Sequence, residues 1–152
     1  MLLNTCMAYS GKYNPTYPNK YKGDPTNIIY RSLWERKLMK YLDNHPDVLE
    51  WASEEFCIPY KSPLDGKMHR YFPDFYVKKR GVGGTIDELV IEVKPSKHLK
   101  EPPTPKRKTR RYFGEMARYA VNQRKFEVAE QFCHARGLKF IIMTEKELDI
   151  KW

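Results

Sequence analysis

The sequence lacks the features that mark membrane, secreted and disulfide-linked proteins. Its longest uninterrupted apolar runs, residues 6–9 and 140–143, have four residues each, whereas a membrane-spanning helix needs roughly 20. Its three cysteines form no CxxC pair and its four histidines are scattered. This pattern indicates neither a disulfide framework nor a zinc site, and it favours a reducing compartment. The first residues show no basic start followed by an apolar stretch, so no signal peptide is predicted.

Basic residues are in excess, and most of that excess lies in one segment. The 152 residues include 28 Lys and Arg against 19 Asp and Glu, a net charge of +9. Residues 94–111 alone carry eight basic residues and one acid, whereas the remainder has 20 basic and 18 acidic residues. Four prolines in this segment predict an irregular basic loop over residues 95–109. Such a loop is either a solvated surface or a segment that follows nucleic-acid phosphates.

Aromatic residues and prolines are dense at the N-terminus. Four tyrosines recur at every fourth position: Tyr9, Tyr13, Tyr17 and Tyr21. The prolines and glycine between them predict an extended Tyr/Pro-rich arm over residues 1–26 rather than a helix. So many rings indicate that the arm packs against its own domain, a partner subunit or nucleic acid, and the first of these is favoured. Residues 27–152 are predicted to form a single domain.

Hydrophobic periodicity predicts a mixed α/β fold for this domain. Helix-start chemistry at residues 24–27 and a helical apolar pattern predict a helix over 28–42. Short apolar and β-branched runs predict strands, and a longer amphipathic stretch predicts a second long helix. The later elements are predicted as strands 56–60, 70–77 and 88–94, helix 109–136, strand 138–143, and a helical turn that opens at Thr144. The order of the main elements is therefore α-β-β-β-α-β.

The predicted strand over 88–94 carries charge where charge is costly. Because side chains alternate between the two faces of a strand, Val90, Glu92 and Lys94 share one face. The strand is otherwise apolar enough to be central in a sheet. Charged side chains at such a place need partners or a metal ion.

The preceding strand contains a second acid. The midpoint between Asp74 and Glu92 is position 83, inside a glycine-rich stretch over residues 81–84. A hairpin about this stretch would place the two carboxylates side by side. Pro73 cannot donate a ladder hydrogen bond, so we expect it to bulge the strand where Asp74 must be oriented.

Two carboxylates and a lysine at one point suit phosphodiester chemistry. Carboxylate oxygens favour Mg²⁺, with Mn²⁺ as the alternative. Such an ion activates water and neutralises charge, and a lysine can orient that water. Glu35 lies at the edge of the apolar face of the first helix, so it either reaches this site or pairs with Arg31. A structural ion pair remains the alternative to a catalytic site.

These residues and the order of the elements resemble the PD-(D/E)xK nuclease superfamily. Its motif reads here as Pro73-Asp74, then 17 residues, then Glu92-Val93-Lys94, with Glu35 at the position of the acid on the first helix. Residues 139–148, KFIIMTEKEL, resemble the end-cleaving subunit of heteromeric transposases. The whole chain, from its MLLNTCMAYSGKYNP start onward, resembles the head completion nucleases of T-even-like tailed bacteriophages.

The resemblance implies a single-domain, restriction-endonuclease-like α/β fold, with an α-β-β-β-α-β core around a central mixed sheet. It implies a deoxyribonuclease that depends on Mg²⁺, or on Mn²⁺, held by Asp74, Glu92 and the Val93 carbonyl. Lys94 would stand beside the nucleophile, and Glu35 would complete the catalytic group. Three polar residues on the following helix are further possibilities, of which only the last is retained as a candidate: Asn122, Gln123 and Lys125.

The resemblance also implies a place in virion assembly. The protein would hydrolyse double-stranded DNA during head completion, after packaging and before head–tail joining. Its partners would be DNA and proteins of the head or portal vertex, in the cytoplasm of the infected bacterium or on the virion, with no membrane involved. The basic loop begins directly after Lys94, which favours contact with the DNA backbone. The expected DNA-binding residues are Lys97, Lys100, Lys106, Arg107, Lys108, Arg110 and Arg111.

Two other functions are consistent with the sequence. One is a structural protein that docks on the head or binds DNA through a nuclease fold. The other is a nuclease for branched DNA or junctions. The sequence neither predicts nor excludes a homo-oligomer.

Overall fold

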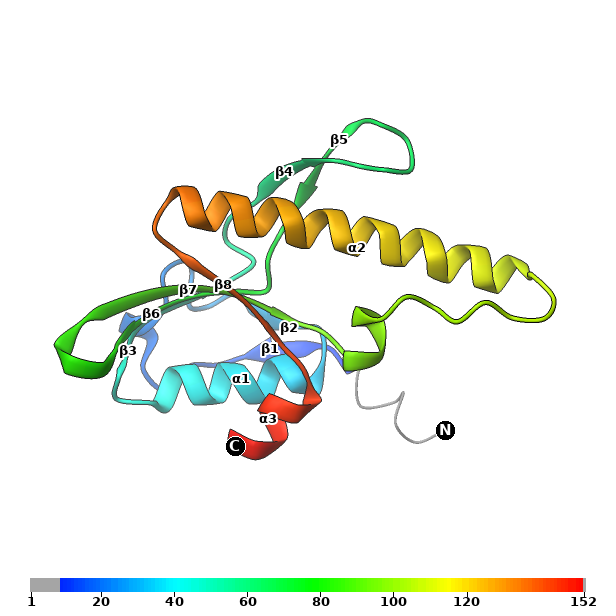
Figure 1. The fold of residues 1–152 in the computed structure, drawn as a ribbon. Helices are drawn as coiled ribbons and strands as arrows, with labels where there is room; N and C mark the ends of the chain where they lie inside the picture. Colours follow the sequence, from blue (N-terminus) through cyan, green and yellow to red (C-terminus); the bar gives the residue numbers. More distant parts are fainter. Residues whose placement is uncertain (1–8, 152) are drawn as a thin grey trace.

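A four-stranded sheet forms the centre of the molecule (Figure 1). The computed structural model describes residues 9–151, with side chains through residue 148. In spatial order the strands are β3 (Val48–Ser53), β6 (Phe75–Arg80), β7 (Ile86–Val93) and β8 (Lys139–Met143). The first three pair antiparallel, whereas β7 and β8 pair parallel. The mixed central sheet predicted from the sequence is confirmed.

Helices cover both faces of this sheet. α1 (Leu33–Asn44) and α3 (Glu145–Lys151) lie against one face, and α2 (Arg110–Ala135) crosses the other (Figure 1). α2 supplies the crossover connection that parallel strands require. On the α1 face, Leu38, Trp51 and Phe75 are buried in the main apolar core. In chain order, α1, β3, β6, β7, α2 and β8 give the predicted α-β-β-β-α-β core.

The first strand of that core differs from the prediction. The segment predicted as strand 56–60 forms β4 (Ile58–Lys61), which pairs with β5 (Met68–Tyr71) in a separate hairpin packed on α2. Its expected place in the sheet is taken by β3, which the periodicity did not reveal. The reason is burial on both sides: Trp51 and Ala52 are neighbours and both are buried. Alternation between polar and apolar residues is therefore lost.

The strand predicted over 70–77 is interrupted at Pro73. β5 ends at Tyr71 and belongs to the hairpin, whereas β6 begins at Phe75 and belongs to the central sheet. Pro73 is fully buried and has no N–H to offer either sheet. The expected bulge is wrong, because the proline ends one strand and the chain changes sheets before the next.

The chain before α1 also differs from the prediction. β1 (Gly11–Tyr13) pairs antiparallel with β2 (Ile28–Tyr30), and a 3-10 turn, η1 (Pro18–Lys20), lies between them. The helix predicted to start at residue 28 begins instead at Leu33. Ser32 is its N-cap, and its hydroxyl accepts a hydrogen bond from the Glu35 N–H at 3.1 Å. Residues 24–27 form a turn in which the Asp24 carboxylate accepts from Thr26.

The described part of the tyrosine-rich segment lies against the domain; residues 1–8 of the predicted arm lie outside the described residues. Tyr13 and Tyr21 are buried, with ring centroids 6.0 and 4.8 Å from that of Trp51 in edge-on contacts. Tyr9 and Tyr17 are exposed. Alternate members of the tyrosine series therefore enter the core.

Asp43 anchors this segment from the end of α1. Its side chain is fully buried and accepts three hydrogen bonds: from the Tyr13 hydroxyl at 2.8 Å, the Thr16 N–H at 2.6 Å and the Tyr17 N–H at 2.9 Å. Lys20 Nζ donates to the main-chain carbonyl of Asp43 at 2.8 Å. Burial and the Asp43 carboxylate raise the pKa of Tyr13, which keeps its phenol a neutral donor.

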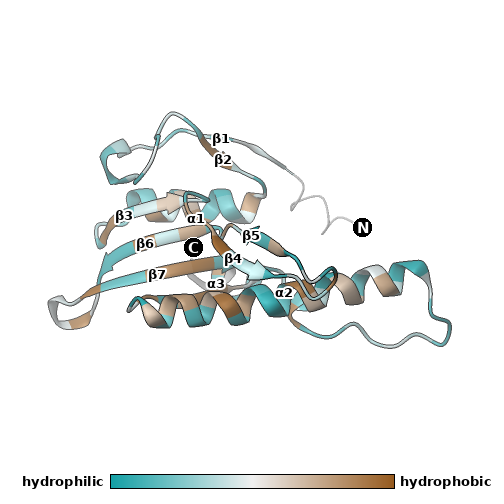
Figure 2. Ribbon diagram, turned by 90° about the horizontal axis from the view of Figure 1, so that it is seen from above, coloured by the Kyte–Doolittle hydropathy of each residue, from teal (hydrophilic) through white to brown (hydrophobic). Residues whose placement is uncertain are grey.

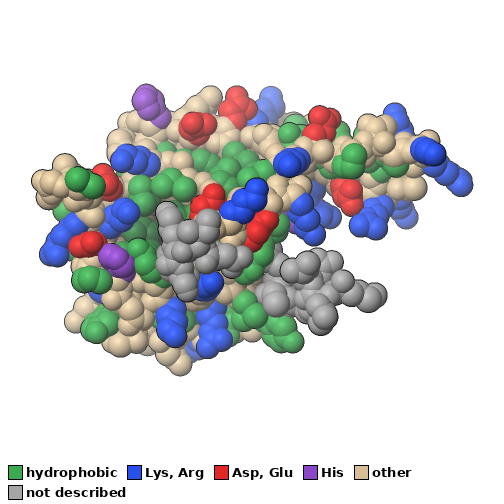
Figure 3. Space-filling view, turned by 60° about the horizontal axis from the view of Figure 1, so that its bottom comes forward, with side chains coloured by type: hydrophobic (Ala, Val, Ile, Leu, Met, Phe, Trp, Pro, Cys, Tyr) green, Lys and Arg blue, Asp and Glu red, His purple; other side chains and the backbone are tan. Residues whose placement is uncertain are grey.

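α2 is longer than the sheet that it crosses. Its C-terminal half buries Phe126, Ala129 and Cys133, whereas its N-terminal half extends beyond the strands beside the irregular segment over 100–109 (Figures 1 and 2). Lys and Arg side chains gather on this projecting part (Figure 3). Neither α2 nor any other helix within residues 9–151 is long and apolar enough to span a membrane.

Candidate active site

The β6–β7 hairpin brings the two predicted carboxylates to neighbouring positions. Its register pairs Phe75 with Ile91 and Arg80 with Ile86. The same register, continued by one residue, sets Asp74 opposite Glu92. The turn is centred on Gly83, whose φ of 75° is in the left-handed region that glycine favours. The hairpin predicted from the midpoint at residue 83 is confirmed.

Glu92 is held on both sides of its carboxylate. The side chain is 6% exposed. Its Oε2 accepts a hydrogen bond from the Tyr71 hydroxyl at 2.6 Å, and its Oε1 lies 3.0 Å from Lys94 Nζ. The ion pair that the sequence offered as an alternative is therefore present. In this pair the buried carboxylate of Glu92 is held in one orientation and is partly neutralised by Lys94.

Asp74 stands in an environment that opposes its ionisation. Burial, followed by the neighbouring charges of Glu92 and Glu35, raises the pKa of this carboxyl well above its ordinary value. One oxygen, Oδ2, accepts a hydrogen bond from the Val93 N–H at 2.8 Å. That bond and Lys94 favour the ionised form but only partly offset the repulsion. One buried and one half-buried acid with a single lysine leave more negative than positive charge at this site.

Glu35 lies at the start of α1 and faces this pair. Its carboxylate accepts a hydrogen bond from the Arg31 main-chain N–H at 2.9 Å, which ties the start of the helix to the residue before its N-cap. Burial raises its pKa, and the charges of Glu54 and Glu92 add to the effect. The Arg31 guanidinium binds Glu54 instead, at 3.0 Å. The expected side-chain pair between Glu35 and Arg31 is therefore replaced by a main-chain contact, and the charge of Glu35 acts on Asp74.

α2 contributes one lysine to the same region. Lys125 Nζ lies 5.5 Å from the Tyr71 ring centroid and 5.7 Å from that of Tyr60, distances at which a cation is attracted to an aromatic face. Burial and the nearby Lys94 lower the pKa of Lys125, while Glu92 and Asp74 oppose that change. Of its neighbours on α2, Gln123 is exposed and Asn122 is buried.

The donor set can be compared with the ligands that a divalent ion needs. Within residues 9–148 no three His, Cys, Asp or Glu side chains are grouped to hold a metal. The candidates are therefore the carboxylates of Asp74 and Glu92 and the predicted carbonyl of Val93. An all-oxygen set of so few protein ligands fits Mg²⁺, which keeps several waters, better than it fits zinc. The excess of negative charge around Asp74 also favours binding of a divalent cation.

The predicted DNA-binding residues follow this site in the chain and are exposed to solvent. The chain leaves β7 at Val93 and forms a short 3-10 turn, η3 (Ser96–Leu99), before the irregular segment. All seven of the predicted contacts are exposed: Lys97, Lys100, Lys106, Arg107, Lys108, Arg110 and Arg111. The last two lie on the first turn of α2.

Tyr71 is a site residue that the sequence reasoning missed. It lies three residues before Asp74, on the other side of the break at Pro73, so no periodicity places its hydroxyl at Glu92. Its position follows from the change of sheet between β5 and β6. Burial and the Glu92 charge raise the pKa of Tyr71 far above its ordinary value, so it remains a hydrogen-bond donor.

Comparison with known proteins gives two matches. Residues 45–145 match the family described as TnsA-like endonuclease N terminal, a range that contains Asp74, Glu92 and Lys94 but not Glu35. The chain is also 39% identical over 146 residues to the head completion nuclease of Enterobacteria phage T4. That alignment covers 93% of this chain and 95% of the phage protein.

Proposed function

This chain belongs to the family of TnsA-like endonuclease N-terminal domains, and we propose that Asp74, Glu92 and Lys94 form the centre at which it cleaves DNA. The main support for this centre is one observation: the β6–β7 register sets Asp74 opposite Glu92, and Lys94 Nζ lies 3.0 Å from Glu92 Oε1. With its similarity to a phage head completion nuclease, the chain is a DNA nuclease that functions in head completion. Proteins of the head or portal vertex are its proposed assembly partners.

The proposed reaction is hydrolysis of a phosphodiester. Asp74 and Glu92, with the Val93 carbonyl, would hold Mg²⁺, and Mn²⁺ is the alternative. A bound ion supplies Lewis acidity and neutralises charge on the phosphate. The oxygen of an attacking water bonds to phosphorus, the bond to the leaving oxygen breaks, and that oxygen takes up a proton. Lys94 orients the water and stabilises the negative charge that develops on the phosphoryl oxygens.

The remaining residues support this centre. Tyr71 fixes Glu92 through a hydrogen bond to Oε2. Lys125 adds a second cation on the α2 side, and Glu35 adds to the negative potential that favours a divalent ion. The exposed cations of the basic loop would contact phosphates beyond the scissile one, which gives affinity without base recognition.

Removal of divalent metal is expected to abolish cleavage. Purified protein with supercoiled plasmid and Mg²⁺ should produce nicked or linear DNA, and excess EDTA should leave the plasmid intact, because two carboxylates alone cannot neutralise the transition state. Mn²⁺ added to the EDTA-treated, dialysed protein should restore cleavage. Equal cleavage with EDTA would contradict the metal dependence, whereas no cleavage by folded protein with either metal would favour a docking role.

Tyr71→Phe is expected to reduce the rate of cleavage about tenfold or more at subsaturating Mg²⁺, because partners of a metal-binding carboxylate tune affinity on this scale. A titration of cleavage rate against Mg²⁺ concentration should show that much of the loss is recovered at high Mg²⁺. Tyr76→Phe is the matched control, since its hydroxyl makes the same 2.6 Å bond to Glu88 on the same strand. If both variants behave alike, Tyr71 has no special part in positioning Glu92.

A further inference from the structure

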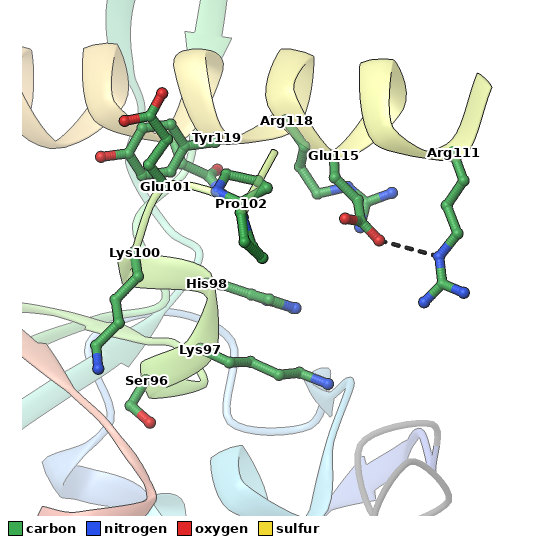
Figure 4. A pocket seen from close by; sticks show the side chains of 12 residues that line it. Ser96, Lys97, His98, Lys100, Glu101, Pro102, Arg111, Glu115, Arg118 and Tyr119 are labelled. Carbon is green, nitrogen blue, oxygen red and sulfur yellow. Dashed lines mark hydrogen bonds and ion pairs between the residues drawn. The ribbon is translucent and has the colours of Figure 1, made fainter. Parts of the chain in front are cut away.

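A cavity of about 530 Å³ lies between α2 and the segment that leaves the candidate active site (Figure 4). Arg111, Glu115 and Arg118 descend into it from the projecting half of α2. Lys97 and His98 extend beneath them from η3. The two walls belong to segments joined by the basic loop, so the cavity is a trough enclosed by one continuous stretch of chain.

The trough leads to the candidate active site. Its α2 wall includes positions 111, 115, 118 and 122, and Lys125 continues the same series at helical spacing of three and four. Lys125 is the residue that lies over Tyr71, next to Glu92. At 1.5 Å per residue, the stripe from Arg111 to Lys125 is about 21 Å long. The opposite wall begins at Ser96, two residues after Lys94.

The lining of the trough has the charge that an anion requires. Arg111 is engaged with Glu115 at 3.0 Å, whereas Arg118 forms no ion pair within the part of the chain that the structure describes. Burial, followed by the positive charges of Lys97, Lys94 and Arg118, lowers the pKa of His98. The trough is lined by Lys97, Lys100, Arg111 and Arg118, with Glu101 and Glu115 as its acids, so a phosphate entering it would meet several cations.

Two further side chains match a nucleotide rather than a simple anion. Asn122 lines the trough and is 8% exposed, and its side chain makes no hydrogen bond within the described residues. Its amide therefore has donors and an acceptor to offer to the polar edge of a base. Tyr119 offers an aromatic ring in the same wall, and such rings stack on bases of any sequence.

The size of the trough limits its occupant. A volume of this order is typical of a pocket for a small molecule, so it admits roughly one or two unpaired nucleotides and excludes a duplex. We propose that the trough binds the single-stranded part of a DNA end, and thus that the preferred substrate is duplex DNA with an overhang whose strand passes along α2 to the cleavage centre. This inference rests on the proposed nuclease function.

The test is a binding measurement that does not require cleavage. Fluorescence anisotropy in EDTA would compare a blunt duplex with one that carries a short 3′ or 5′ overhang. The wild type should bind one overhang duplex at least about fivefold more tightly than the blunt one. The variants Arg118→Ala and Tyr119→Ala should each remove most of that difference, since one stacked base contributes a factor of this size or more. Blunt-duplex binding should change little.

Arg124→Ala is the matched control, because it removes the same charge from another face of α2, where Arg124 pairs with Glu127 at 2.9 Å. It should keep the overhang preference. Equal affinity for blunt and overhang DNA, or an unchanged preference in both trough variants, would overturn the inference while leaving Mg²⁺-dependent plasmid cleavage intact. Failure of the nuclease proposal would be distinguishable, because the protein would then bind overhang DNA but would not cleave plasmid with Mg²⁺.

Discussion

Glu92→Gln is expected to lower the rate of DNA cleavage by about 10³-fold or more, the scale on which loss of a catalytic group acts. The substitution keeps the size of the side chain and an oxygen that can accept from Tyr71, so the fold should survive. What is lost is one negative charge beside Asp74 and Lys94. The measurement is the rate of plasmid nicking at saturating Mg²⁺, together with a circular dichroism spectrum for each protein.

Glu88→Gln gives a close comparison for this variant. Glu88 lies on β7, and its Oε2 accepts a hydrogen bond from Tyr76 at 2.6 Å, as that of Glu92 does from Tyr71. Glu88 differs in being only half-buried and in lying away from Asp74 and Lys94, at the other end of the strand pairing. The Glu88 variant should keep near-normal activity. Substantial cleavage by Glu92→Gln, or an equal loss in both variants, would remove Glu92 from the catalytic assignment.

Asp43→Ala is expected to produce the largest loss of stability outside the catalytic site, about 3–5 kcal/mol. The Asp43 side chain accepts from Tyr13, Thr16 and Tyr17, and its removal leaves three donors without an acceptor. The Tyr13 hydroxyl is among them and is buried. Urea unfolding followed by circular dichroism would measure the change, with the midpoint moving to lower urea.

The control for this variant is Asp47→Ala, because Asp47 is close in sequence and exposed. Exposed substitutions of this kind change stability by roughly 0.5 kcal/mol or less. Below its unfolding transition, Asp43→Ala should still cleave plasmid, since Asp43 lies at the C-terminal end of α1 and Glu35 at its start. A change in unfolding free energy similar to that of the control would show that the tyrosine-rich segment is not anchored by Asp43.

The geometry of the carboxylate pair could be predicted because two regular rules determine it. Alternation along a strand puts Glu92 and Lys94 on one face, and the symmetry of an antiparallel hairpin about Gly83 sets Asp74 opposite Glu92. Both depend only on local sequence. The catalytic roles of Asp74, Lys94 and Glu35 are proposals, and Glu92→Gln tests the role of Glu92.

The errors have a common physical cause, which is competition between local patterns and tertiary contacts. Asp24 has the chemistry of a helix cap, but Ser32 and Glu35 form the capping contacts, and Ile28 pairs with Tyr13 in a strand. β3 was missed because burial of adjacent side chains removes its alternation. Only the sheet order shows that Pro73 moves the chain from one sheet to another.

Residues outside the motif were the hardest to predict. Tyr71 reaches Glu92 through the packing of the β4–β5 hairpin on α2, a contact between distant segments. The trough needs α2 to extend past the sheet and the proline-rich segment to return beside it. The density of basic residues predicted Lys97 and Arg111 as DNA-binding residues. No sequence pattern distinguishes Arg118 or Asn122 from other residues of a long helix.

The sheet topology also separates two events in the assembly of the site. Phe75 and Ile91, which adjoin Asp74 and Glu92, are 16 residues apart, whereas Leu89 and its parallel partner Lys139 are 50 apart. Closing the longer segment costs about 1 kcal/mol more chain entropy. The carboxylates are thus brought together by a short hairpin that can form early, before α2 crosses the sheet. The second wall of the trough depends on the slower, non-local pairing of β8.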